Sequence, residues 1–269
     1  MIKHGKLNAF TLLFPMFYFV LSLNVFALPG EDYAESLVDA AFENELYNDS
    51  YWHTLLHYKT TVSGNLSLID DPEFFLSEDG RKNPKSELEA TINAFFRPVE
   101  ADKKHPVCRF AARFYWLKEK IPIDVSRLPA AQCQAFERMI EEMKPVSASI
   151  IFPTYHMNNP ASMFGHTLLT IETENQSKLL SYAINYAAVT DETFGPVYAL
   201  KGLMGFYEGY FSILPYYTKL QEYGDMSDRD IWEYPLNLTR EEIIRMLLHV
   251  YELDYIYSNY FFFDENCSY

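Results

Sequence analysis

The stretch FPTYHMNNPASMFGHTLLTIE, residues 152–172, contains the change of pattern that decides how the second half of the chain folds. Its first part is rich in Asn, Pro and Ser, which favour turns, and Gly165 leads into an apolar run typical of a strand. His166 stands at the start of that strand. A histidine there could serve as the base for a nucleophile from elsewhere in the chain; a packed core histidine is the alternative.

The same strand-like pattern extends around this stretch. We expect strands at residues 147–152, 165–172, 179–188, 210–216 and 229–238. One helix follows them, because Thr239 and Glu242 form a capping box before an apolar face that includes Ile243 and Leu247. The sequence therefore predicts an α+β domain over residues 145–269.

Before Pro145 the chain is mainly helical in pattern. Residues 28–144 include helix-like runs around residues 31–47, 86–96, 106–120 and 129–144, joined by loops rich in turn residues. Pro145 marks the boundary between this helical module and the strands. The predicted fold class is therefore α+β, with a helical module preceding the sheet domain.

The first 27 residues indicate export. A short basic segment with Lys3 and Lys6 precedes an apolar stretch, and Val25-Phe26-Ala27 fits cleavage after Ala27. An uncleaved membrane anchor is the alternative, although Pro15 would kink it. In either case we expect the body of the protein outside the cytoplasm.

The charge balance argues against nucleic acid as a partner. The chain has 22 basic and 37 acidic residues, a formal net charge of −15. Removing residues 1–27 takes away Lys3 and Lys6 and leaves 20 basic and 37 acidic residues, a formal charge of −17. Such a chain would be repelled by phosphate backbones, so no nucleic acid is expected.

Three cysteines suggest one disulfide and one thiol. Cys108 and Cys133 lie in two helix-like runs, and a bridge between them would close a loop of about 25 residues, worth about 3.5 kcal/mol in the chain-entropy view. Cys267 would then be free. In an oxidising compartment this favours a catalytic thiol; a buried inert thiol or an intermolecular bridge is the alternative.

Two other features of the sequence could indicate a binding site. His53 and His57 lie four residues apart in HTLLH, but the adjacent Glu of a zinc hydrolase motif and a third ligand are lacking, so we expect structural roles, no metal and no cofactor. The aromatics in the second half could line an acyl-chain groove, although core packing is favoured. They include Tyr207, Tyr210, Phe211, Tyr216 and Tyr217.

Several motifs in order carry a family resemblance: NNPASMFGHTLL (158–169), LLSYAINYAA (179–188), RDIWEYPLNLT (229–239) and YFFFDENCSY (260–269). Together with YALKGLMGFYEGYFSILPYY they resemble the bacterial Lnb N-terminal periplasmic domain family, named after the lipoprotein intramolecular transacylase. The preceding module resembles one that often comes before this domain in Gram-negative members. The order of His and Cys is similar to circularly permuted papain-like enzymes of the NlpC type, which implies an antiparallel-sheet domain.

The resemblance implies a Cys–His acyl-transfer site, with Cys267 as nucleophile and His166 as its base. Asn185 would orient the imidazole, with a cross-strand structural amide as the alternative. Further residues would line an oxyanion or substrate pocket, or serve only as turn residues: Ser162, Tyr155 and Asn266. In such folds the cysteine starts a helix, yet only two residues follow Cys267, so we expect a C-terminally truncated product of a longer member.

Three functions follow from these observations. The first is a periplasmic thiol acyltransferase or lipid-ester hydrolase of a Gram-negative bacterium, acting on lipoproteins or phospholipids, with a membrane surface as a further partner. The second is a peptidoglycan amidase or peptidase using the same two residues. The third is a non-catalytic envelope binding module.

Overall fold

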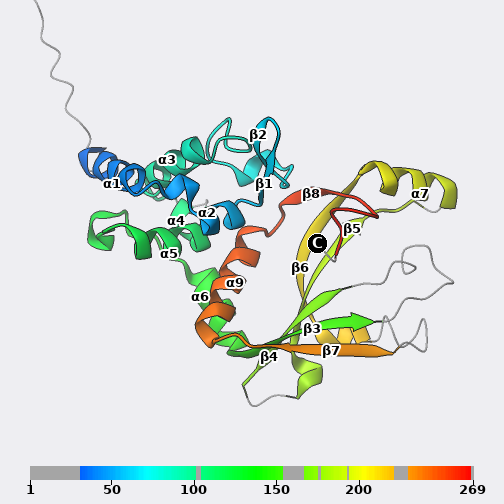
Figure 1. Cartoon of the computed structure of the whole chain (residues 1–269). Helices are drawn as coiled ribbons and strands as arrows, with labels where there is room; N and C mark the ends of the chain where they lie inside the picture. The colour runs from blue at the N-terminus through cyan, green and yellow to red at the C-terminus, as the bar shows by residue number, and fades with distance from the viewer. Residues whose placement is uncertain are drawn as a thin grey trace, which may run out of the picture.

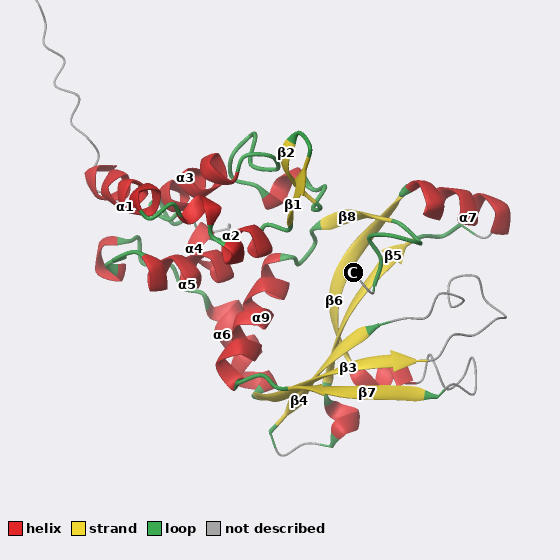
Figure 2. Ribbon diagram, viewed as in Figure 1, coloured by secondary structure: helices red, strands yellow, loops and turns green. Residues whose placement is uncertain are grey.

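The computed structural model describes residues 31–100, 104–153, 167–174, 177–192, 194–220 and 230–267. Helices gather at one end of the molecule and a curved sheet at the other, with two helices between them (Figures 1 and 2). Mixed helices and antiparallel sheets confirm the predicted α+β class. We call residues 31–144 the helical region and residues 145–267 the sheet region.

The helical region is built from short helices with capped starts. Asp49 and Asn83 accept backbone N–H groups at the starts of the second and third helices, which satisfies donors that lack partners within the helix. The helices are α1 (Glu31–Glu43), α2 (Ser50–Leu55), α3 (Pro84–Ala94), α4 (Pro106–Arg109), α5 (Ala111–Lys120) and α6 (Gln134–Met143).

A hairpin interrupts these helices and was missed by the sequence analysis. Strands β1 (Tyr58–Thr61) and β2 (Gly64–Ser67) pair in antiparallel register, with Thr61 opposite Gly64. Gly64 has a φ of +116°, a conformation that glycine adopts readily and other residues rarely do. The strands are too short to show a clear alternation, so their sequence gave only a weak signal.

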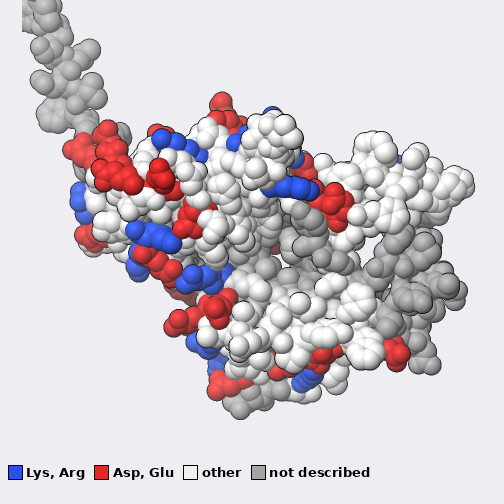
Figure 3. Space-filling view, viewed as in Figure 1, with Lys and Arg blue, Asp and Glu red and all other residues white. Residues whose placement is uncertain are grey.

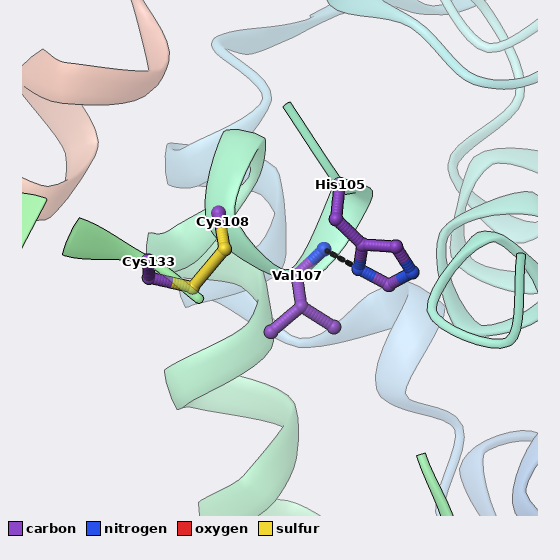
Figure 4. The surroundings of a disulfide bond; sticks show 4 residues. All are labelled: His105, Val107, Cys108 and Cys133. Atoms are coloured by element: carbon purple, nitrogen blue, oxygen red, sulfur yellow. Dashed lines mark hydrogen bonds between the residues drawn. A yellow bond between two sulfur atoms is a disulfide. The ribbon is translucent and has the colours of Figure 1, made fainter. Parts of the chain in front are cut away.

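The predicted disulfide between Cys108 and Cys133 is confirmed, with the two Cα atoms 5.0 Å apart (Figure 4). Cys108 lies in α4 and Cys133 directly precedes α6. The expected single helix over residues 106–120 breaks at Phe110 into α4 and α5. His105 is buried and caps α4, because its Nδ1 accepts the Val107 N–H at 3.3 Å.

The sheet region contains six antiparallel strands in the order β7-β3-β4-β5-β6-β8. The five expected strands correspond to the first five in chain order, whereas β8 and the helix α7 were not predicted. The elements are β3 (Pro145–Pro153), β4 (Leu168–Thr173), β5 (Tyr182–Val189), α7 (Gly195–Met204), β6 (Tyr207–Pro215), β7 (Ile231–Leu236), α9 (Arg240–Glu252) and β8 (Tyr257–Tyr260).

Helix α9 joins the two regions. Its predicted capping box is confirmed: the Glu242 carboxylate accepts the Thr239 N–H at 2.7 Å, and Thr239 Oγ1 accepts the Glu242 N–H at 3.3 Å. One face packs Ile243 and Leu247 on the sheet, and Leu248 belongs to the core of the helical region. The two regions are therefore packed together through a shared helix.

The opposite face of the sheet carries a second, smaller core. Ile151, Leu168 and Ala183 are buried there with Tyr216. Neighbouring residues on one strand point to opposite faces, so Ala183 lies on this face while Ile184 faces α9. None of the helices in the described ranges is both long and apolar enough to cross a membrane.

Candidate functional site

The segment after β8 folds back on itself and carries Cys267 to its position. The Phe261 N–H donates to the Glu265 carbonyl at 3.1 Å, and the Asn266 side-chain amide donates to the Phe262 carbonyl at 3.0 Å. The Phe262 N–H also donates to the Gly202 carbonyl of α7 at 3.0 Å. The turn before Cys267 is therefore anchored on α7 by backbone contacts.

Two glycines explain how the segment can approach α7 so closely. A Cβ atom at Gly202 would collide with the ring of Phe262, and one at Gly205 would collide with the ring of Phe261. Gly205 also ends α7 in a left-handed conformation with a φ of +71°. The two glycines thus leave room for the two phenylalanine rings against α7.

Cys267 is not part of a disulfide and is half-buried, and Tyr260 is one of its partners. A side-chain hydrogen bond joins the Tyr260 hydroxyl and the Cys267 thiol. Burial raises the pKa of Tyr260 far above its usual range, and the nearby negative charge of the Cys267 thiolate adds to this. Tyr260 therefore stays protonated and can donate its hydrogen bond to the sulfur.

A cavity of about 90 Å³ lies beside this segment. Its wall is mostly apolar and comes from both regions, which distinguishes it from a pocket internal to the sheet domain. Burial raises the pKa of Glu265, followed by the negative charges of Asp264 and Asp70. The lining residues are His57, Leu68, Ile69, Tyr186, Phe211, Ser258, Glu265 and Asn266.

A half-buried histidine pair includes His57, which lines the cavity. His57 Nε2 and His249 Nε2 are 2.9 Å apart and the rings stack, so one nitrogen must donate and the other accept. Burial lowers the pKa of His57 to about 4, with the charge of Arg113 as a second cause, and lowers that of His249 as well. Both imidazoles are therefore neutral near pH 7.

The HTLLH pair does not form a joint site. His53 Nε2 lies 2.9 Å from the Tyr47 carbonyl, while His57 faces His249 instead. Within the described residues, no group of three or more His, Cys, Asp or Glu side chains is arranged to hold a metal ion. The pairing of His57 with His249 joins positions 192 residues apart, so nothing local in the sequence indicated it.

The predicted site residues are only partly visible. His166, Ser162 and Tyr155 lie outside the described residues. Asn266 directly precedes Cys267 and lines the cavity. Asn185 is buried on β5 next to Tyr186, and by strand alternation its side chain lies on the opposite face of the sheet.

The role of Asn185 stays a prediction, because its proposed partner His166 lies outside the described residues. Tyr186 stacks near Tyr260, with ring centroids 5.5 Å apart, and bonds with the Ser258 hydroxyl. Sequence reasoning missed Tyr186 and Tyr260, since tyrosines are frequent in this half and the motifs do not single them out. Three of the five aromatics noted above have different surroundings: Phe211 lines the cavity, Tyr207 contacts Phe262, and Tyr216 is in the core.

Two known family models match different parts of the chain. The model of the Lnb N-terminal periplasmic domain matches residues 135–269, half of the chain, so the protein belongs to this family. A domain of unknown function, DUF7843, matches residues 44–120 in the helical region. No individual curated protein and no solved structure gives a significant match. Family membership indicates a periplasmic domain with a role related to lipoprotein processing in the cell envelope.

Proposed function

We propose that this chain is a thiol acyltransferase or lipid-ester hydrolase of the Gram-negative periplasm, exported by residues 1–27 and acting on lipoproteins or phospholipids. The observation that carries the proposal is the Cys267 thiol, which forms no disulfide, is half-buried within the family domain, is hydrogen-bonded to Tyr260 and lies next to the cavity. The other two cysteines are joined in a disulfide and unable to react. The apolar side chains of Leu68, Ile69 and Phe211 suit an acyl group better than a peptidoglycan peptide.

The proposed reaction has two halves. The Cys267 thiol loses its proton to His166, and the sulfur attacks the carbonyl carbon of an acyl ester. The C–O bond breaks, the alcohol leaves with the proton from His166, and a thioester remains. An amine or water then attacks the thioester, the C–S bond breaks, and the proton given up by the attacking group restores the thiol through His166.

The remaining predicted residues keep supporting roles in this proposal. Asn185 is the proposed partner of the His166 imidazole, and Ser162, Tyr155 and Asn266 are proposed to line the oxyanion or substrate pocket. Asn266 is favoured by its place in the cavity wall, directly before the nucleophile. No metal ion or cofactor takes part in the proposed steps.

The test uses the mature chain with a synthetic lipopeptide that carries ester-linked acyl chains, and with phospholipid vesicles. Mass spectrometry of the chain after rapid quenching should find one acyl group on Cys267. Cys267→Ala and His166→Ala should abolish acylation and turnover. His53→Ala is the matched control and should retain both, because His53 contacts the Tyr47 carbonyl and the Tyr58 ring within the helical region.

Any of three results would overturn the proposal. Turnover in Cys267→Ala equal to that of the unchanged chain would exclude a thiol mechanism. Cleavage of peptidoglycan fragments, with no acylation by either lipid probe, would favour the amidase alternative. Binding of the lipopeptide without any acylation of Cys267 would favour the non-catalytic binding module.

A further inference from the structure

The edge strand of the sheet is held by the helical region. Strand β8 lies at the end of the strand order and pairs with β6. An edge strand leaves backbone groups without a neighbouring strand. Here the Tyr257 carbonyl accepts the Asp71 N–H at 3.2 Å, and the Asn259 N–H donates to the Asp70 carboxylate at 2.8 Å. Two consecutive residues of the helical region thus take the place of a neighbouring strand.

Asp70 is itself fixed. Its side chain is only 12% exposed and forms an ion pair with Arg81 through the second carboxylate oxygen. The loop before it is tied to the hairpin, because the Leu68 N–H donates to the His57 carbonyl at 3.0 Å and the Ile69 N–H donates to Ser67 Oγ at 3.1 Å. The contact with β8 therefore comes from a rigid part of the helical region.

Strand β8 leads directly to the thiol. Asn259, which Asp70 holds, precedes Tyr260, and Tyr260 bonds with Cys267. Leu68 and Ile69, just before Asp70, line the same cavity as Asn266. A shift of β8 away from Asp70 would therefore move the Tyr260 hydroxyl and open the cavity wall beside the cysteine.

We propose that Asp70 is a positioning residue for the acyl-transfer site, which it holds through the Asn259 backbone and Tyr260. This inference rests on the proposed function of Cys267. It assigns the helical region a role in the reaction: the region matched by the domain of unknown function completes the site instead of forming a separate module. Asp70 touches neither the sulfur nor the substrate, so its effect must pass through β8.

The test measures the thiol and the turnover separately. Iodoacetamide labelling of Cys267 from about pH 5 to about pH 9 gives the apparent thiol pKa, and acyl transfer to the lipopeptide gives kcat and KM. For Asp70→Ala we expect kcat to fall between about tenfold and a hundredfold with KM little changed, because a small displacement of a reacting group costs rates of this size. The apparent thiol pKa should move toward the value of about 8.5 found for an unconstrained cysteine.

Two further variants distinguish positioning from a loss of stability. Asp70→Asn keeps an oxygen that can accept the Asn259 N–H, so it should restore most of kcat and the original labelling profile. Asp49→Ala removes a helix cap and an ion pair with Lys120 in the same region, without any contact to β8. It should lower the melting temperature yet leave the labelling profile unchanged.

The outcomes separate this inference from the proposed function. An Asp70→Ala chain with the kcat and labelling profile of the unchanged chain would overturn the inference, even if Cys267→Ala is inactive. If Asp49→Ala shifts the profile as much as Asp70→Ala, the effect is general destabilisation and the inference also fails. If Cys267→Ala keeps full turnover, the proposed function fails, and a labelling shift confined to Asp70→Ala would still show that Asp70 positions the thiol.

Discussion

The helical region and the far end of the sheet region differ in how completely they bury their apolar side chains. The helical region encloses its apolar side chains, with Trp52, Leu88 and Leu117 fully buried. At the far end of the sheet, α7 leaves Leu200 and Met204 more than half exposed. In the space-filling view, most visible charges lie over the helical region, and the surface over α7 is largely uncharged (Figure 3). Helix α7 contacts Phe261 and Phe262 of the segment before Cys267. Its other contacts include Tyr207 of β6 and an ion pair between Lys201 and Glu192.

The centre of the helical region also contains charge. Arg113 is fully buried, with its Nη1 2.7 Å from Glu87 and its Nε 3.3 Å from Glu252. The Glu252 carboxylate accepts the Arg113 N–H at 2.9 Å, and the Phe74 carbonyl accepts from Nη2 at 2.8 Å. Glu252 belongs to α9, so this network joins the helical region to the sheet region. Burial raises the pKa of both carboxyls, while the Arg113 charge opposes the increase.

The largest expected effect comes from breaking this network. Arg113→Ala leaves two carboxyls buried without their cation, which should lower the free energy of unfolding by about 3–5 kcal/mol. Urea unfolding at neutral pH measures the loss. The control is Arg245→Ala, which removes an exposed α9 pair with Glu119 of α5 and should cost about 1 kcal/mol or less. Equal losses in the two variants would contradict a special role for burial.

The contact between α7 and the segment before Cys267 can be tested at Gly205. Gly205→Ala places a methyl group against the Phe261 ring and requires a left-handed conformation, so we expect a loss of about 1–3 kcal/mol. Iodoacetamide labelling of Cys267 should also become faster as the segment loosens. Gly195→Ala, at the other end of α7, meets no atom within 4 Å and is the matched control. Slow labelling in both variants would show that the glycine contact does not hold the segment.

A smaller effect should appear on mild acidification, about one pH unit below 6.5, at the boundary between the regions. The pKa of His57 is depressed to about 4, so the unfolded chain binds a proton that the folded chain does not. Stability is fully present above about pH 6.5 and should fall by about 1.4 kcal/mol per pH unit toward pH 4 for this group. Urea unfolding of the unchanged chain and of His249→Gln with His57→Gln, at neutral and mildly acid pH, isolates this slope. If the free energy of unfolding of the two chains changed with pH by the same amount, the prediction would be wrong.

The features that the sequence predicted correctly depend on residues close together in the chain or on the number of cysteines. The capping box of Thr239 and Glu242, the five strands in order, and the Cys108–Cys133 pair each follow from spacing or composition within a short stretch. The contacts that build the site are different in kind. His57 meets His249 and Asp70 meets Asn259 across 192 and 189 residues. Neither contact leaves a periodic pattern, since each depends on how β8 and α9 dock against the helical region.

The disulfide has a consequence for how the two family regions can be separated. Cys108 lies within residues 44–120, matched by the domain of unknown function, and Cys133 lies two residues before the match at residues 135–269. The disulfide therefore links the two matched regions covalently, in addition to the residues that connect them along the chain. A protease that cuts the chain in this connection would leave both fragments attached, and only a reductant would release them. In the oxidising compartment proposed here, a single cut would not free the helical region from the domain that carries Cys267.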